Sequence, residues 1–359
     1  MIPQIEPWID DEELKEITEV IKSTFLTESK KTKEFEEKFK ELTGTGHALA
    51  FCNGTATLFT ALKVLGIGEG DEVIAPAMTF VATINSIILA GAKPVLVDVD
   101  KKTFQIDASK IEEKITNKTK AIMPVHLYGQ VADMDKIMKI AKKHKLKVVE
   151  DAAQAVGAEF NGKHSGTFGD FGSFSFYGNK TITTGEGGML VTDNKNLAEE
   201  AYRFKNHGRL VKGVFVHEKV GFNFSFTEMQ AAIGLAQLRK LNKIITNKEN
   251  IRNIYMRELA GIKKIKFTEV DPRCSPVHWF TSIILDDVDS FAEELKKRGV
   301  QTRRFFFPII KQECYRGMFS GEYPNAEYAY QHGLSLPSSA TLKEETILEI
   351  CKIIKEVIK

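Results

Sequence analysis

Short apolar segments alternate with amphipathic helical segments through the first 150 residues, and this alternation limits the possible folds more than any other feature of the sequence. Each apolar segment has five or six residues, the length of a buried strand. Strands that alternate with helices favour an α/β fold with a mainly parallel sheet, in which ligands bind beyond the carboxyl ends of the strands. The expected strands are 48–52, 72–76, 94–99, 121–125 and 147–151, and the expected helices between them are 58–65, 79–89 and 134–144.

Further helices flank this region, and the pattern changes near residue 264. Asp10, with Glu13 three residues later, forms a capping-box pattern that predicts the first helix over residues 10–23. We predict two domains, a large one over residues 1–245 and a smaller C-terminal α/β domain over residues 246–359. The smaller domain is expected to contain strand-like segments 278–285 and 301–305 and helices 290–298 and 344–357.

The composition is that of an ordinary globular protein and argues against several kinds of partner. Its 50 basic and 48 acidic residues give a net charge of +2, so we expect no nucleic-acid partner. No apolar run is long enough to span a bilayer, and the acidic N-terminus does not resemble a signal peptide, so we expect no membrane association and a cytoplasmic location. Cys52, Cys274, Cys314 and Cys351 lack ligand spacing, so we expect neither disulfides nor a metal site.

Three features at strand ends and turns together suggest a cofactor. The turn Asn53–Thr57 would present backbone N–H groups and hydroxyls at a helix N-terminus, which favours a phosphate. Asp151 ends a buried strand, and Lys180 lies between two segments of small residues, where desolvation would lower its pKa and allow attack on a carbonyl. Taken singly, these residues could be a helix cap, another cap and a surface lysine. Taken together, they supply what pyridoxal phosphate (PLP) requires: phosphate donors, a carboxylate for the ring nitrogen and an amine for the aldehyde. His126, after another strand, is expected to be structural.

These segments closely resemble those of the DegT–StrS family of PLP-dependent sugar-nucleotide aminotransferases, which share the fold-type I architecture of aspartate aminotransferase. The resemblance is strong from about Ile5 to about Leu241 and weak in the remainder. The matching segments include NGTATLFTALKVLGIGEGDEV, VVEDAAQAVGA, FGSFSFYGNKTITTGEGGML and GFNFSFTEMQAAIGLAQL. The resemblance implies a PLP enzyme with a large, mostly parallel sheet domain and a smaller C-terminal domain.

The resemblance also implies roles for residues around the cofactor ring. Lys180 would hold the cofactor and then move a proton between the cofactor and the substrate carbon. Asp151 would pair with the pyridine nitrogen, and Gln154 would lie near the ring hydroxyl. Phe80 would stack on the face of the ring.

A second set of residues is implied for the cofactor phosphate. Gly54, Thr55 and Ser175 would bind it within one subunit, and Ala56 lies in the same cofactor-binding turn. Asn223 would reach the phosphate of the neighbouring subunit's cofactor, which implies a homodimer with active sites at the interface.

The lysine segment resembles that of family members that aminate a 4-keto sugar. The implied reaction transfers the amino group of L-glutamate to GDP-4-keto-6-deoxy-D-mannose and gives GDP-perosamine. The same reaction on a UDP- or dTDP-linked 4-keto sugar remains open, partly because Ser225 stands where the family usually has arginine. Arg303 and Arg304 could pair with the substrate diphosphate or form a solvated charge pair.

Three other classes of protein fit less well. A 3-dehydratase of the same fold carries histidine in place of Lys180. A catalytically silent sensor would have no need to keep Asp151, Gln154 and Lys180 together. A nicotinamide dehydrogenase would have GxGxxG after its first strand, and this sequence has none there.

Overall fold

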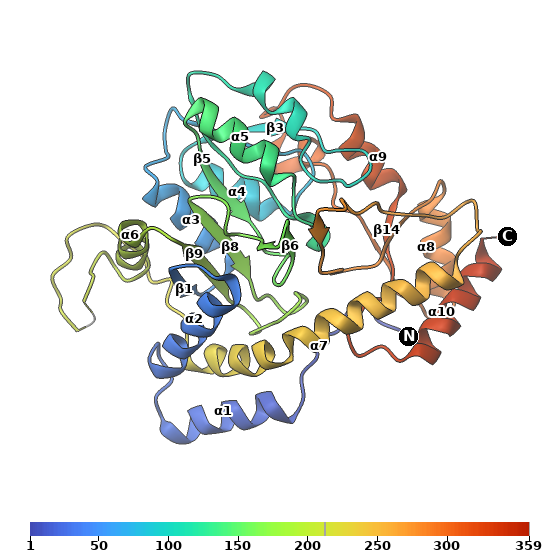
Figure 1. The fold of residues 1–359 in the computed structure, drawn as a ribbon, viewed down its shortest axis with the longest axis horizontal. Coiled ribbons are helices and arrows are strands. Elements are labelled where there is room, and N and C mark those ends of the chain that lie inside the picture. The colour runs from blue at the N-terminus through green and yellow to red at the C-terminus, as the bar shows by residue number, and fades with distance from the viewer. Residues whose placement is uncertain (212, 359) are drawn as a thin grey trace.

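The computed structural model describes residues 1–211 and 213–358, and its centre is a seven-stranded sheet (Figure 1). The strand order is β1-β9-β8-β5-β4-β2-β3, and the β8–β9 and β9–β1 pairs are antiparallel whereas all other pairs are parallel. The strands are β1 (His47–Phe51), β2 (Glu72–Pro76), β3 (Lys93–Val97), β4 (Thr119–Ile122), β5 (Lys147–Asp151), β8 (Phe171–Ser175) and β9 (Gly188–Thr192). The expected mostly parallel sheet is therefore confirmed.

Helices cover this sheet and explain why its strands read as continuous apolar runs. Every residue of β2, β8 and β9 is buried, as expected for strands covered on both faces. The helices between the strands are α3 (Gly54–Val64), α4 (Val81–Leu89), α5 (Met134–His144) and α6 (Lys195–Lys205).

The N-terminal helices α1 (Asp11–Ser23) and α2 (Lys30–Thr43) pack against the long helix α7 (Glu228–Glu258). The capping box of Asp10 and Glu13 is present at the start of α1, as predicted. Helix α7 is one uninterrupted helix of 31 residues that extends from the large sheet to the C-terminal elements (Figure 1). The predicted boundary between residues 245 and 246 falls inside this helix, and the division into two domains stays a prediction.

The C-terminal part of the chain builds a second sheet of four short strands, in the order β10-β12-β14-β13. Helices α8 and α10 pack on each other beside this sheet, and α10 also packs on α7. The N-terminus returns to the same region, where Ile2 pairs with Val300 (Figure 1). The elements are β10 (Lys266–Phe267), β12 (Ser282–Ile284), α8 (Val288–Lys297), β13 (Arg303–Arg304), α9 (Pro324–His332), β14 (Gly333–Ser335) and α10 (Glu344–Val357).

One segment from beyond α7 lies against the large sheet region. Strand β11 (Cys274–Ser275) pairs with β6 (Glu159–Phe160), which in turn pairs with β7 (Lys163–His164). We call residues 271–279, which include β11, the strap. No helix within the described residues is long and apolar enough to cross a membrane.

Candidate active site

The carboxyl end of β5 carries Asp151, whose side chain is buried among polar partners. The Thr83 hydroxyl donates a 2.7 Å hydrogen bond to Oδ2, and the Ala153 N–H donates to Oδ1 at 3.2 Å. Thr83 lies on α4 and also bonds the Thr79 hydroxyl at 2.8 Å. Burial raises the pKa of Asp151, while the Thr83 hydrogen bond opposes this change. A cationic group that faced this carboxylate would offset the cost of burying its charge.

Lys180 lies in the loop between β8 and β9, and its backbone N–H donates to the Tyr177 carbonyl at 2.9 Å. Its side chain is partly buried, and Nζ lies 4.4 Å from the centroid of the Trp279 ring. Burial lowers the pKa of Lys180 to about 8, while the negative charge of Asp151 acts in the opposite direction. A useful fraction of the amine is therefore neutral and nucleophilic near neutral pH.

The first turn of α3 forms a cradle against the ends of β8 and β9. Asn53 caps the helix, because its Oδ1 accepts a 2.9 Å hydrogen bond from the Ala56 N–H. A Cβ added to Gly54 would lie 3.0 Å from Cβ of Ser175, and one added to Gly188 would lie 2.6 Å from the carbonyl carbon of Asn53. Only glycine permits this close approach. The first N–H groups of a helix have no intrahelical partner and favour an anion.

Gln154 is buried beside the strand ends and holds a neighbouring loop. Its Oε1 accepts a 2.8 Å hydrogen bond from the N–H of Tyr128, a residue with a φ of +56°. The Tyr128 hydroxyl in turn accepts a 3.0 Å hydrogen bond from the Phe306 N–H. The sequence did not point to Tyr128, although it links Gln154 to the C-terminal part of the chain.

Phe80 and Asn223 are the most exposed of the predicted residues. Phe80 caps α4, is 53% exposed and lies with its ring centroid 6.1 Å from that of Phe306. Asn223 is exposed, accepts a 3.3 Å hydrogen bond from the Ser225 N–H and precedes Phe224, whose carbonyl accepts from the Cys52 N–H. The structure thus groups Lys180 with Asp151 and places Asn223 on the surface near the start of α3.

His126 has the structural environment that was expected. Its Nε2 lies 2.8 Å from Oε2 of Glu150, and both side chains are fully buried. Glu150 also accepts hydrogen bonds from the N–H groups of Gly166, Phe168 and Gly169 at 2.6–2.8 Å. This carboxylate is therefore satisfied by the fold, and the pair braces the loop before β8.

The residues at this edge fit PLP on structural grounds. The glycine-lined cradle at α3 suits a phosphate, the buried Asp151 carboxylate suits a cationic ring nitrogen, and Lys180 offers a partly neutral amine. No group of three or more His, Cys, Asp or Glu side chains that could hold a metal ion occurs within the described residues. A fold of this kind with such a site defines a PLP-dependent aminotransferase.

The chain belongs to the DegT/DnrJ/EryC1/StrS aminotransferase family, whose sequence model matches residues 7–355. It is 39% identical to the GDP-perosamine synthase of Escherichia coli O157:H7, over 99% of this chain and 98% of that protein. Two solved structures are also similar. S. venezuelae DesV has a TM-score of 0.94 at 33% identity, with 97% of this chain and 95% of that chain covered. Helicobacter pylori PseC, an aminotransferase involved in pseudoaminic acid biosynthesis, has a TM-score of 0.95 at 30% identity, with 99% and 98% covered. The predicted family, fold class, cofactor and transaminase activity are thereby confirmed, and sugar compounds are the substrate class.

Proposed function

We propose that this sugar aminotransferase moves the amino group of L-glutamate to the 4-keto carbon of GDP-4-keto-6-deoxy-D-mannose and forms GDP-perosamine. The observation that carries this proposal is the 39% identity to a GDP-perosamine synthase over nearly the whole of both chains. Free cysteines at positions 52, 274, 314 and 351 agree with the cytoplasm as the proposed location.

Lys180 has the central role in the proposed reaction. Its amine holds PLP, and after release the same amine takes the proton from the glutamate carbon and later returns one to the sugar carbon. A pKa lowered to about 8 by burial supports both tasks, because the amine can accept and donate a proton near neutral pH. When bound, PLP supplies the electron sink for the negative charge at the reacting carbon and carries the amino group between the two half-reactions.

Asp151 is proposed to pair with the protonated ring nitrogen and keep it charged. Its buried carboxylate is held from two directions by Thr83 and Ala153, so its orientation is fixed before the cofactor arrives. Gln154 is proposed to lie near the ring hydroxyl. Its Oε1 is occupied by the Tyr128 N–H, whereas Nε2 has no hydrogen-bond partner among residues 1–211 and 213–358.

The phosphate is proposed to bind at the first turn of α3. Gly54, Thr55 and Ala56 offer backbone N–H groups, and Ser175 offers a hydroxyl from the end of β8. Phe80 is proposed to stack on the ring, and its 53% exposure leaves a face of its side chain free for this contact.

A homodimer is part of the proposal, with Asn223 of each subunit at the partner's phosphate. Its support is a loop that projects from the molecule beyond α6 (Figure 1). Three of its apolar side chains are strongly exposed: Phe215 at 81%, Val216 at 68% and Val220 at 87%. Such a concentration of exposed apolar surface is typical of a protein–protein interface.

A matched amination assay tests the substrate. The purified enzyme with PLP and glutamate would receive the GDP-, UDP- or dTDP-linked 4-keto-6-deoxy sugar, and the product mass would be measured. We expect conversion of the GDP sugar. Conversion of only the UDP or dTDP sugar would retain the aminotransfer and reject the proposed nucleotide, and Ser225 would then be the first position to examine.

A further inference from the structure

We propose that Trp279 is a positioning residue for the Lys180 amine. This inference rests on the proposed role of Lys180 and adds a residue that lies a hundred positions further along the chain. Trp279 holds the lysine at two points, at the peptide bond that precedes it and at the tip of its side chain.

The first contact is made by the edge of the indole. The Trp279 ring N–H donates a 2.6 Å hydrogen bond to the carbonyl of Asn179, the residue before Lys180. The second contact is made by the ring face, whose centroid lies 4.4 Å from Nζ. Within the described residues, Nζ makes no hydrogen bond and no ion pair, so the indole is its one close contact.

Trp279 is itself held firmly. Its side chain is 2% exposed, and its ring lies against the rings of Phe280 and Tyr128, at centroid distances of 4.2 Å and 6.4 Å. Its carbonyl accepts a 3.1 Å hydrogen bond from the Lys248 amine, which also donates to the Ser338 carbonyl at 2.8 Å. Lys248 lies on α7, so the longest helix of the molecule fixes the backbone of this tryptophan.

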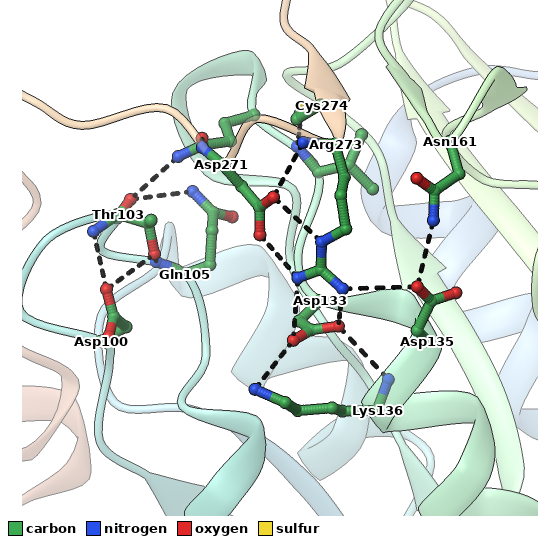
Figure 2. Close-up of polar contacts among 12 residues, drawn as sticks. Asp100, Thr103, Gln105, Asp133, Asp135, Lys136, Asn161, Asp271, Arg273 and Cys274 are labelled. Carbon is green, nitrogen blue, oxygen red and sulfur yellow. Dashed lines mark hydrogen bonds and ion pairs between the residues drawn. The ribbon is translucent and has the colours of Figure 1, made fainter.

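The strap fixes Trp279 from the other direction. Figure 2 shows Arg273 between Asp271, Asp133 and Asp135, with guanidinium–carboxylate distances of 2.6–3.3 Å. Closer to Trp279, the Val277 N–H donates to the Gly129 carbonyl at 2.9 Å. A side chain at position 129 would overlap the Val277 carbonyl oxygen, so the strap can lie at this depth only because that residue is glycine.

This arrangement has a consequence for the proposed reaction. A lysine side chain has four rotatable bonds, and its amine must return to the same place after each release from the cofactor. The electron-rich indole face attracts the amine when it is protonated and restricts its positions. Lys180 acts in both half-reactions, so loss of the indole should slow both by a similar factor.

Single-turnover measurements of the two half-reactions would test this inference in Trp279→Leu and Trp279→Phe, with Trp8→Phe as the control. Trp8 is the other tryptophan of the chain, and its ring lies 4.8 Å from the amine of another lysine, Lys243. We expect Trp279→Leu to slow the glutamate and sugar half-reactions equally, by about tenfold, with unchanged KM values. Trp279→Phe, which keeps a ring face, should recover part of the rate, and Trp8→Phe should match the wild type.

The rates are to be expressed per bound cofactor, so that a partly unfolded or cofactor-depleted variant does not mimic the effect. Unchanged rates in both Trp279 variants would overturn the inference. Slowing of only one half-reaction would also overturn it, because it would indicate a contact with that substrate. If borohydride reduction of the wild-type holoenzyme did not fix the cofactor on Lys180, the proposed function itself would fail, whatever the tryptophan variants did.

Discussion

The Thr83 hydroxyl donates a 2.7 Å hydrogen bond to the Asp151 carboxylate, and the two residues come from different elements, α4 and β5. Asp151 is thereby held in one orientation although burial alone would favour its neutral form. This hydrogen bond is the strongest observed influence that keeps the carboxylate charged, and its removal should affect both protonation and catalysis.

Thr83→Val removes this donor and nearly preserves the shape of the side chain. We expect the pKa of Asp151 to rise further, because a hydrogen bond to the charged form has been lost. The acid limb of the pH–rate profile should move to higher pH, and turnover should fall by about tenfold, since hydrogen bonds to charged groups contribute about 1.5–3 kcal/mol. Thr79→Val, which keeps the direct donor, is the control and should change the profile much less.

Asp151→Asn should separate stability from activity. The pKa of Asp151 is higher in the folded apoenzyme than in the unfolded chain, so the wild type loses stability as pH rises from about 3.9 through the folded value. The asparagine variant lacks this loss. We therefore expect its apoenzyme to be more stable than the wild type at pH 7 and equally stable below about pH 3.9. Its turnover should fall by about 10- to 150-fold through loss of a charge-assisted hydrogen bond. Calorimetry against pH and steady-state rates would measure the two effects; equal stability at pH 7 would contradict the first.

The sequence was sufficient to predict one part of this site and insufficient for the other. Asp151 lies at the end of a buried strand in a parallel sheet, where ligands bind, and Lys180 lies between segments of small residues, so local patterns identify both. Thr83 and Trp279 have no such pattern. Trp279 approaches Lys180 only because the strap crosses from the C-terminal part of the chain onto the large sheet region, a tertiary contact that no local periodicity encodes.

The fold shows the same division between local and tertiary information. The strands were predicted to within a few residues because their burial on both faces leaves continuous apolar runs. Helix α7 was expected to continue towards residues 248–259, and it does so without interruption. The pairing of β11 with β6 could not be predicted, because two-residue strands carry too little pattern.

Lys180 should be the position at which the cofactor is trapped. Reduction of the holoenzyme with borohydride, followed by peptide mass mapping, should find the cofactor on the peptide that contains Lys180. Lys180→Ala should abolish trapping there and lower turnover by at least about 10²- to 10⁴-fold, the range for loss of a general acid/base. Lys195→Ala is the control, since Lys195 is exposed and 3.9 Å from Glu199. Trapping on another lysine in the wild type would reject the assignment.

The lowered pKa of Lys180 also predicts how the stability of the apoenzyme depends on pH. Folding reduces the pKa from an unfolded value near 10.4 to about 8, so between these values the unfolded chain binds more protons and the wild type gains stability as pH rises. Lys180→Met has no such gain. We expect the methionine variant to be more stable by up to about 3 kcal/mol at and below pH 8, with the advantage lost by about pH 10.5. Denaturant unfolding at a series of pH values would measure this, and a constant difference would contradict it.

Mixing two inactive variants would test whether the active site is shared between subunits. Lys180→Ala lacks the proposed catalytic amine, and Asn223→Ala lacks the side chain proposed to reach the partner's phosphate. In a mixed dimer, the site with an intact Lys180 would receive an intact Asn223 from the Lys180→Ala subunit. One site in each mixed dimer would then be complete.

We therefore expect activity to return when the two variants are unfolded, mixed and refolded together, up to about a quarter of the wild-type value for random pairing of equal amounts. Each variant refolded alone should stay at its own low activity, and light scattering should report a dimer in all samples. No recovery in samples that contain dimers would mean that Asn223 serves its own subunit. A monomer would reject the shared site altogether, and the exposed Phe215 and Val220 would then need another partner.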